Sequence, residues 1–198
     1  MIENIQIIEK PDRVSWDEIH EVLAKAHESN RAHGINMRKP SLPGSEIKNE
    51  VGKDGIMLVA IHEDKIIGTA ALLFKSKHTW YNSGSYGYMC FAGVLPEYRG
   101  TGTYRLLSEE RERIARNKNL SGLYIDTHNR NTHLIDIALK NGFRKVDVKV
   151  CKDHWNIVLF KWLNGCPYSD FKCQIEFYIR KSLMMPKRIL RTIKRHIR

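Results

Sequence analysis

The sequence of 198 residues lacks the features of a membrane-spanning or secreted protein. No run approaches the roughly 18 apolar residues that a transmembrane helix needs, and no basic segment followed by an apolar stretch opens the chain. Cysteines at the Cys-x-x-Cys spacing of metal sites are also missing, because the four cysteines are Cys90, Cys151, Cys166 and Cys173. We therefore predict a cytoplasmic protein without a metal site, whose thiols are reduced rather than paired in disulfides.

Acidic residues are scarce in one part of the chain only. Residues 172–198 hold nine Lys/Arg and a single acid, Glu176, a net charge of +8, whereas residues 1–171 hold 24 bases and 21 acids. Near the end of the chain, isoleucines recur every fourth position among basic residues, at Ile189, Ile193 and Ile197. This pattern predicts a basic amphipathic helix, which lies on an anionic membrane surface, binds nucleic acid or packs on the domain.

The hydrophobic pattern predicts a mixed α/β domain. Helices are expected at residues 16–30, 45–51, 101–118 and 131–141, and Ser15 and Glu18 form a capping box at the start of the first. Strands are expected on both sides of an acidic turn at residues 63–65, and also at residues 5–8, 86–95, 120–127, 143–151 and 155–163. This order of elements implies a sheet whose first half is antiparallel.

One stretch, LPEYRGTGTYRLL at residues 95–107, joins an expected strand to an expected helix. Gly100 and Gly102 allow the backbone to approach a ligand closely, and the first turn of a helix leaves N–H groups unpaired. Arg99 adds a cation in front of the glycines, and two threonines beside them add hydroxyls. The stretch is therefore either an ordinary turn between a strand and a helix or a cradle for a phosphate.

This stretch resembles the glycine motif of the GNAT superfamily of acetyl-CoA-dependent N-acetyltransferases, with the matching residues Val94, Pro96, Arg99 and Gly102. A later segment is similar to a helix and strand of the same family, with the matching residues Asn131, Gly142 and Phe143. The likeness implies a GNAT-like, mixed and mostly antiparallel central sheet flanked by helices over residues 1–163. Residues 164–198 then form a basic C-terminal helical extension of that domain.

The resemblance implies direct transfer of an acetyl group from acetyl-CoA, the acyl donor, to an amine. It also implies that the strand backbone at Ala92, Gly93 and Val94 orients the thioester, and that Asn131 reaches the donor near its pantetheine arm. The resemblance further implies that the pyrophosphate is held by Arg99 and by the backbone N–H groups of Gly100, Thr101, Gly102, Thr103 and Tyr104.

Two residues depart from the family pattern. Tyr104 stands where Gly or Ala is usual, and its bulk would narrow the pyrophosphate site or shift the ligand. Ala138 stands where the family often has a tyrosine that protonates the leaving thiolate. The chain is thus an acetyltransferase or, as the alternative, a non-catalytic acyl-CoA-binding or regulatory module on a GNAT-like scaffold.

Tyr88 and His128 are the candidates for proton transfer. Tyr88 lies on a strand face without a carboxylate of its own, so a base there would act through water or come from elsewhere. It is either a proton relay or an aromatic side chain packed on a helix. An unperturbed histidine has a pKa of about 6.5, which makes His128 suited to proton transfer. It is either a catalytic group, which Asp126 two residues earlier would orient, or a solvated loop histidine.

The acceptor is the least defined partner, a small-molecule or peptide amine. The resemblance implies that residues 24–51 shape its site. Bases in this range include Arg31, His33, Arg38, Lys39 and Lys48, which fit either an anionic acceptor or a solvated basic loop. Residues 170–183 either pack on the sheet or form the contact of a homodimer. A tail bound to lipid would place this cytoplasmic protein at the periphery of a membrane.

Overall fold

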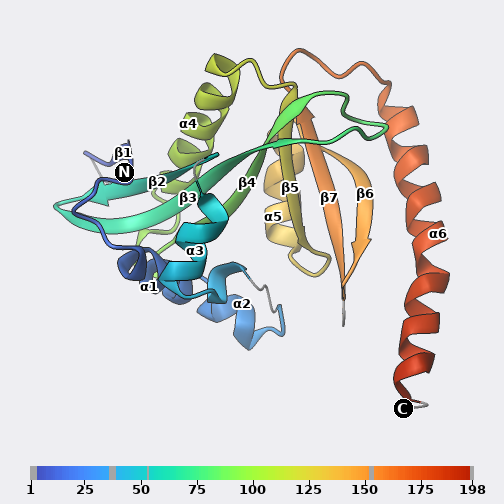
Figure 1. Cartoon of the computed structure of the whole chain (residues 1–198), viewed down its shortest axis with the longest axis horizontal. Helices are drawn as coiled ribbons and strands as arrows, with labels where there is room; N and C mark the ends of the chain where they lie inside the picture. Colours follow the sequence, from blue (N-terminus) through green and yellow to red (C-terminus); the bar gives the residue numbers. More distant parts are fainter. Residues whose placement is uncertain (1–3, 36–38, 53, 152–153, 197–198) are drawn as a thin grey trace.

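The computed structural model describes residues 4–35, 39–52, 54–151 and 154–196, with the backbone alone from residue 185 onward. Seven strands form one sheet in the order β1-β2-β3-β4-β5-β7-β6 (Figure 1). They are β1 Gln6–Glu9, β2 Gly55–His62, β3 Lys65–Ser76, β4 Ser85–Val94, β5 Gly122–His128, β6 Arg144–Val150 and β7 Trp155–Trp162. Neighbouring strands are antiparallel except β4 and β5, which are parallel. The predicted mixed, mostly antiparallel sheet is confirmed.

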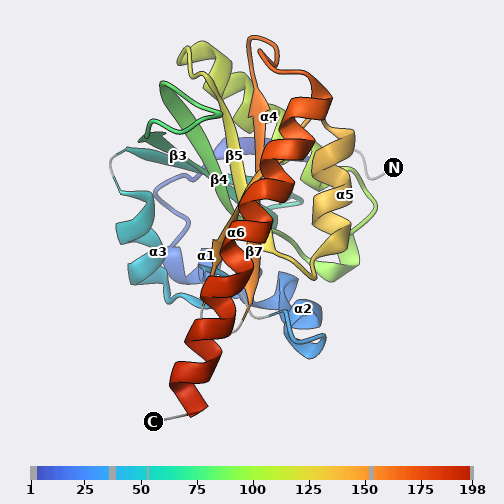
Figure 2. The same cartoon turned by 90° about the vertical axis from the view of Figure 1, so that its right-hand side faces the viewer.

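Helices cover both faces of the sheet and one edge. One face, here called the α4/α5 face, carries α4 (Thr103–Asn117) and α5 (Thr132–Lys140) (Figure 1). The opposite face, here called the Tyr88 face, carries α1 (Trp16–Ala26) and α3 (Gly44–Val51). The short helices α2 (Glu28–Ala32) and η1 (Lys39–Ser41) lie between them in the chain, and η2 (Pro96–Tyr98) follows β4. The edge strand β6 packs with α6 (Asp170–His196) (Figure 2).

Alternating side chains of β2 explain why the sheet binds helices on both faces. Val59 packs with Leu23 of α1 and Ile47 of α3, whereas the neighbouring Leu58 packs with Leu107 of α4. All five side chains are at most 1% exposed, and burying each stabilises the fold by about 1.5–3 kcal/mol. The resulting two-sided core fixes β4 and α4, which frame the candidate site.

The beginning of α1 follows the prediction and its end does not. The capping box is present, because Ser15 Oγ accepts from the N–H of Glu18 at 3.1 Å and the Glu18 carboxylate accepts from the N–H of Ser15 at 2.7 Å. The expected continuation to residue 30 is wrong, because His27 interrupts the helix. Its imidazole Nε2 lies 2.8 Å from the carbonyl oxygen of Ala92 in β4. A tertiary contact thus sets the end of this helix.

The C-terminal extension is a single long helix. The predicted basic helical extension over residues 164–198 is present as α6, whose 27 residues run through Pro186 without a break. Its first half packs on β6, with Cys173 1% and Phe177 5% exposed, which fits the expectation that residues 170–183 pack on the sheet. In the part of the chain that the structure describes, no helix has the length and apolar character needed to cross a bilayer. Outside the described side chains lie Ile189, Ile193 and Ile197.

Candidate active site

The sheet opens between β4 and β5, because these strands pair at one end only. Residues 86–88 of β4 pair with residues 122–124 of β5, and no further pair joins these two strands along their described lengths, although each stays paired with its other neighbour (Figure 1). In the part of β4 that does not pair with β5, Phe91 has a left-handed φ of 48° and the register against β3 shifts. Such a bulge bends a strand locally. The opening beyond Tyr88 and Tyr124 is called the gap below.

The loop after β4 holds two glycines in conformations that other residues rarely adopt. Gly100 has a φ of 80° and Gly102 a φ of 90°, so a side chain at either position would strain the backbone. A Cβ atom added at either glycine would meet no atom of the described residues within 4 Å, so the space in front of the loop is open in this part of the structure. Gly102 is the N-cap of α4, and no described side chain caps this helix. Open N–H groups at a helix N-terminus favour an anion such as a phosphate.

Side chains of this loop bind the protein itself rather than the open space. Arg99 Nη2 donates to the carbonyl oxygen of Ala26, the last residue of α1, at 2.7 Å. Thr101 donates to the carbonyl oxygen of Tyr98 at 2.7 Å, and its hydroxyl lies 2.7 Å from that of Thr103. Arg99 was expected to pair with phosphate oxygens, and any such role competes with its contact to α1. The backbone is the part of the loop that is open to a ligand.

His27, at the end of α1, contacts the part of β4 that does not pair with β5. Its Nε2 lies 2.8 Å from the carbonyl oxygen of Ala92, and its Nδ1 lies 3.0 Å from the amide nitrogen of Asn30. Burial is the main reason that the pKa of His27 is lowered, so the ring is neutral, accepts from Asn30 and donates to Ala92. A Cβ atom at Gly93 would lie 2.8 Å from a side-chain carbon of α1, and Val94 is buried beside α4. Of the three residues expected to orient the thioester, Ala92 therefore lies at the bulge, whereas Gly93 and Val94 follow it in regular pairing with β3. All three are close to α1 or α4.

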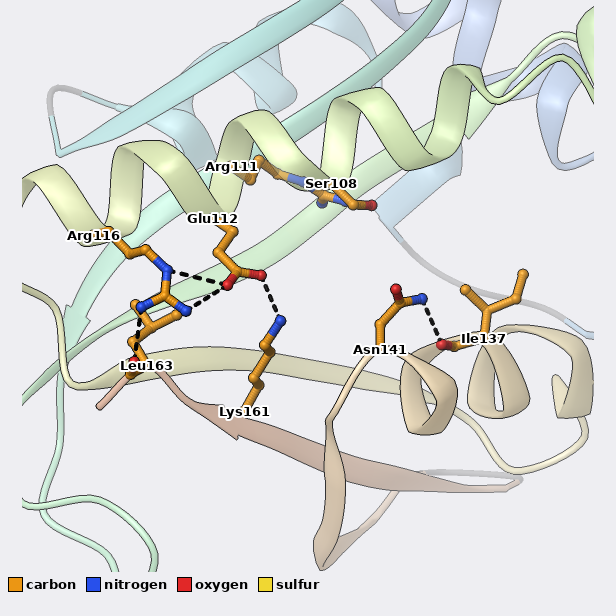
Figure 3. A network of polar contacts seen from close by, with 8 residues as sticks. All are labelled: Ser108, Arg111, Glu112, Arg116, Ile137, Asn141, Lys161 and Leu163. Atoms are coloured by element: carbon orange, nitrogen blue, oxygen red, sulfur yellow. Dashed lines mark hydrogen bonds and ion pairs between the residues drawn. The ribbon is translucent and has the colours of Figure 1, made fainter. Parts of the chain in front are cut away.

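A hollow of about 170 Å³, here called the α4/α5 hollow, lies between α4 and α5 above β4 and β5. Tyr104, Ser108 and the small Ala138 contribute to its lining. Ser108 accepts from Arg111 Nη2 at 3.2 Å, and the Arg111 side chain is only 1% exposed (Figure 3). Burial lowers the pKa of Arg111, and no carboxylate among the described residues pairs with it. A buried positive charge without a described carboxylate partner therefore lies behind Ser108, which lines the hollow, and sequence reasoning missed it.

A polar network fixes the separation of α4 from the strands beneath it (Figure 3). Glu112 of α4 accepts from Lys161 of β7 at 2.6 Å and from Arg116 at 2.7 Å. Arg116 also donates to the carbonyl oxygen of Leu163 at 2.8 Å. On the other side of the hollow, Asn141 closes the last turn of α5 by donating to a carbonyl oxygen at 2.8 Å. The contacts to Lys161 and Leu163 therefore tie α4 to β7 and to the residue that follows it, beside the α4/α5 hollow.

On the Tyr88 face, Tyr88 is paired with a carboxylate. Its hydroxyl donates to Asp126 Oδ1 at 2.6 Å, and Asp126 Oδ2 forms an ion pair with Lys149 at 3.0 Å. Burial, and then the charge of Asp126, raise the pKa of Tyr88, so the hydroxyl stays protonated. The strand face of β4 itself carries no carboxylate, and the carboxylate beside Tyr88 comes from elsewhere, because β5 lies parallel beside β4 and brings Asp126 next to Tyr88. A single sequence gives no signal for that register.

Lys39 and Glu50 come to the same place from the segment between α1 and β2. Lys39 Nζ forms an ion pair with Glu50 at 2.6 Å and lies 4.8 Å from the ring centre of Tyr88 and 4.7 Å from that of Phe91. An ammonium over aromatic rings is a favourable contact. Lys39 therefore belongs to the site rather than to a solvated basic loop, whereas Arg38 of that loop lies outside the described residues.

His128 and Asn131 stand at the end of β5. His128 is 4% exposed, and its ring stacks on His154 with centres 4.3 Å apart, so it is not a solvated histidine. Burial first, and then the nearby charges, lower its pKa, and Nδ1 accepts from the N–H of Arg130 at 3.0 Å. Asp126 binds Tyr88 and Lys149, and no bond from it to His128 is found among the described residues. Asn131 caps α5 and donates to Thr127 Oγ1 at 3.2 Å.

A second hollow, here called the tyrosine hollow, lies on the Tyr88 face and measures about 570 Å³. The buried hydroxyl of Tyr124 has no hydrogen-bond partner among the described residues. Lys149 lies over the ring of Tyr124, with Nζ 4.9 Å from its centre. Aromatic and charged side chains together line this space, among them Tyr81, Tyr86, Tyr124, Asp147 and Lys149. A volume of this order suits a small-molecule ligand.

These features lie within one known family. The profile of the Acetyltransferase (GNAT) family matches residues 16–143, which is more than half of the chain and includes the gap and the glycine loop. The chain belongs to the GNAT family of acetyltransferases. A comparison with curated protein sequences finds no significant match. Within the described residues of this GNAT protein the four cysteines form no disulfide, and no cluster of His, Cys, Asp or Glu is suited to hold a metal.

Solved GNAT structures have the same fold. One is a GNAT acetyltransferase from Elizabethkingia anophelis with acetyl-CoA bound, with a TM-score of 0.59, 19% identity, and 81% of this chain and 99% of that one covered. The PaiA N-acetyltransferase from Thermoplasma acidophilum in complex with coenzyme A has a TM-score of 0.63 and 19% identity, with 80% of this chain and 99% of that one covered. Aminoglycoside 6′-acetyltransferase type Ii has a TM-score of 0.61 and 15% identity, with 82% of this chain and 99% of that one covered. The predicted GNAT fold is thus confirmed.

Proposed function

We propose that this GNAT protein transfers an acetyl group from acetyl-CoA to an amine by direct attack in the gap between β4 and β5. The observation that carries the proposal is the gap itself, with the Gly102-capped start of α4 beside it. The N–H groups at a helix start fit a pyrophosphate, and the backbone N–H and C=O groups of β4 that face the gap can hydrogen-bond to the amides of a pantetheine arm. Structural neighbours with acetyl-CoA and coenzyme A bound support this choice of donor.

The donor would lie against residues from both sides of the gap. The backbone from residue 100 to residue 104 would hold the pyrophosphate, because Gly100 and Gly102 leave open space there. The bulge at Ala92, held by His27, would set the depth of the thioester. Asn131 would face the donor from the start of α5, while its side chain also caps that helix.

Proton removal from the acceptor would take place on the Tyr88 face. An amine attacks only after its ammonium form loses a proton, so a base must lie beside the attacking nitrogen. Asp126 is suited to this role, directly or through the hydroxyl of Tyr88 at 2.6 Å. The raised pKa of Tyr88 keeps that hydroxyl a donor, so it orients or relays rather than acting as the base itself. His128 borders the same strand end and is the second candidate for the relay.

The leaving thiolate would be stabilised from the α4/α5 face. Ala138 carries no proton donor, so the role that a tyrosine often has in this family must be met elsewhere. Arg111 is a buried cation, and it donates to Ser108, which lines the α4/α5 hollow. A fixed positive charge in a low-dielectric site stabilises developing negative charge strongly. We therefore assign the stabilisation of the thiolate to the charge of Arg111, which Ser108 holds in place by accepting from Arg111 while it donates to the carbonyl oxygen of Tyr104.

The acceptor amine would enter from the tyrosine hollow. This space shares Tyr124 and Lys149 with the surroundings of Asp126, and its volume of about 570 Å³ admits a small molecule or the side chain of a peptide. Its aromatic walls suit an amine with an apolar or ring-shaped body. The unpartnered hydroxyl of Tyr124 would hydrogen-bond to the acceptor.

A second candidate function is an acyl-CoA-binding module without transfer. Ala138 favours it, because no side chain from that position of α5 can protonate a leaving group. The two functions share the donor site and differ in turnover. A module of this kind would bind acetyl-CoA and release coenzyme A no faster with amines than without them.

Turnover with a broad panel of amines tests the proposal. We expect coenzyme A thiol to be released with at least one amine, and mass spectrometry to identify the acetylated product. Tyr88→Phe should lower kcat by about 10²-fold, whereas the matched control Tyr178→Phe, 61% exposed on α6, should leave kcat unchanged. Binding of acetyl-CoA without acetylation of any amine would support the binding module, and absence of binding would refute both functions.

A further inference from the structure

The solvent-exposed side of α6 carries large apolar side chains. On the strand side of the helix, Cys173 and Phe177 are buried against β6. On the other side, a second apolar stripe recurs at spacings of three and four residues, which places its members on one helix face. This stripe consists of Phe171 (71% exposed), Ile175 (42%), Tyr178 (61%), Ile179 (49%) and Leu183 (65%). The helix is therefore apolar on two sides, and only one of them contributes to the core.

Exposed apolar side chains are concentrated on this helix. Among the described residues, Ile8 in β1, at 37%, is the one other large apolar side chain of comparable exposure. Isolated exposed apolar residues are common in soluble proteins, but a continuous stripe is typical of an interaction surface. Its position on one helix face suggests that a flat surface or a single groove covers it.

The charge of the same segment indicates what kind of surface covers the stripe. Residues 172–198 carry nine Lys/Arg and one acid, Glu176, which pairs with Arg180. Six of the nine bases follow the stripe along the chain, at residues 187–198. A helix that combines an apolar stripe with many basic residues is typical of helices that lie in the interface of anionic membranes. We propose that α6 binds along an anionic lipid surface, with its apolar stripe between the headgroups and the start of the acyl chains. This inference does not depend on the proposed acetyl transfer.

Alternative partners fit this surface less well. A second copy of the chain would bring two segments of net charge +8 together, and like charges at close range oppose association. A nucleic acid would neutralise the charge but would leave side chains such as Phe171 and Leu183 in contact with water or phosphates. An anionic bilayer is the partner that satisfies both the charge and the stripe.

The shape of the molecule allows this arrangement. Beyond the part packed on β6, α6 continues past the body of the domain in both views (Figures 1 and 2). Its 27 residues span about 40 Å, which is long enough for an extended contact parallel to a bilayer. Since β6 is the edge strand, two places from β5, the helix can lie on a membrane while the gap stays open.

Co-sedimentation of the full chain with lipid vesicles tests the proposal. Vesicles of phosphatidylcholine with roughly one third phosphatidylglycerol provide the anionic surface, and pure phosphatidylcholine vesicles are the neutral control. We expect binding to the anionic vesicles, weaker binding at high salt, and little binding to neutral ones. The double substitution of Ile175→Glu and Ile179→Glu should lower the partition coefficient about tenfold or more, because it places charges in the apolar layer. Ile8→Glu, the matched control on β1, should leave it unchanged.

The controls separate the alternatives. Unchanged thermal unfolding and acetyl-CoA binding of the double variant would show that its folding is intact, which keeps this test independent of the acetyl-transfer proposal. Absence of binding to anionic vesicles, or equal binding of the native chain and the double variant, would overturn the proposal. A dimer in light scattering that the double variant loses, or DNA binding with no vesicle binding, would assign the surface to another partner and would overturn it equally.

Discussion

On the α4/α5 face, the site is built mainly from backbone. It consists of the positive-φ residues Gly100 and Gly102, the start of α4, where Gly102 is the N-cap, and the edge of β4 that does not pair with β5. On the Tyr88 face it is built from side chains that four separate segments supply, with Tyr88, Asp126, Lys149 and the Lys39–Glu50 pair as its main members. The comparison teaches that one face can recognise a ligand that many proteins share, since backbone groups do not vary. The other face can vary its chemistry freely, and we place the acceptor there.

Asp126→Asn should break the Tyr88 face and leave the α4/α5 face intact. The amide keeps the shape but loses the charge that accepts from Tyr88 and pairs with Lys149. We expect kcat to fall by about 10²–10⁴-fold, because the base is lost, with the Kd for acetyl-CoA unchanged within about threefold. Steady-state kinetics and calorimetry measure the two quantities, with Asp136→Asn, an exposed acid on α5, as the control. A loss of acetyl-CoA affinity equal to the loss of rate would contradict the separation of the two faces.

Ile137→Trp should disturb the α4/α5 face and leave the Tyr88 face intact. Ile137 lines the α4/α5 hollow, and a larger ring there would fill part of its volume of about 170 Å³. We expect the Kd for acetyl-CoA to rise about tenfold or more, because the ring would occupy space that the donor needs. Ile8→Trp, on exposed β1, is the control for the added ring. Unchanged acetyl-CoA affinity in a folded Ile137→Trp variant would place the donor outside this hollow.

A pair of tyrosine substitutions compares two hydroxyls of the Tyr88 face. The hydroxyl of Tyr124 is buried without a partner, so Tyr124→Phe should stabilise the free protein by about 1 kcal/mol. The hydroxyl of Tyr88 is bonded to Asp126, so Tyr88→Phe should destabilise it by a similar amount. Thermal or denaturant unfolding measures both changes. Destabilisation by Tyr124→Phe would mean that its hydroxyl is already satisfied and does not await an acceptor.

The smallest expected effect concerns pH. Burial lowers the pKa of His27 and of His128, so both are neutral in the folded protein. Below the unfolded value of about 6.5 the unfolded chain binds more protons than the folded one, so the free energy of unfolding falls as the pH falls from about 6.5. His27→Gln should flatten this decline, whereas exposed His33→Gln should not. A stability that is constant or rises over this range would show that the histidines are charged when folded.

The parts of the site that a sequence can reveal are those fixed by local backbone chemistry. Gly102 could be predicted because a helix start with positive φ requires glycine, and the capping box of Ser15 and Glu18 is equally local. The bond of Tyr88 to Asp126 depends on the parallel register of β4 and β5, which no short pattern encodes. Likewise, Arg99 matches the family motif, but its contact with α1 depends on the packing of a distant helix.

Calorimetric titration with acetyl-CoA tests the central claim that the loop after β4 and the gap form the donor site. Gly102→Asp places a charge and a strained backbone at the start of α4. Gly165→Asp is its match, because Gly165 also has a positive φ, 87°, and no atom within 4 Å of an added Cβ, yet lies after β7. We predict that the native chain and Gly165→Asp bind acetyl-CoA alike and that Gly102→Asp does not bind. Equal binding by all three proteins would contradict the account.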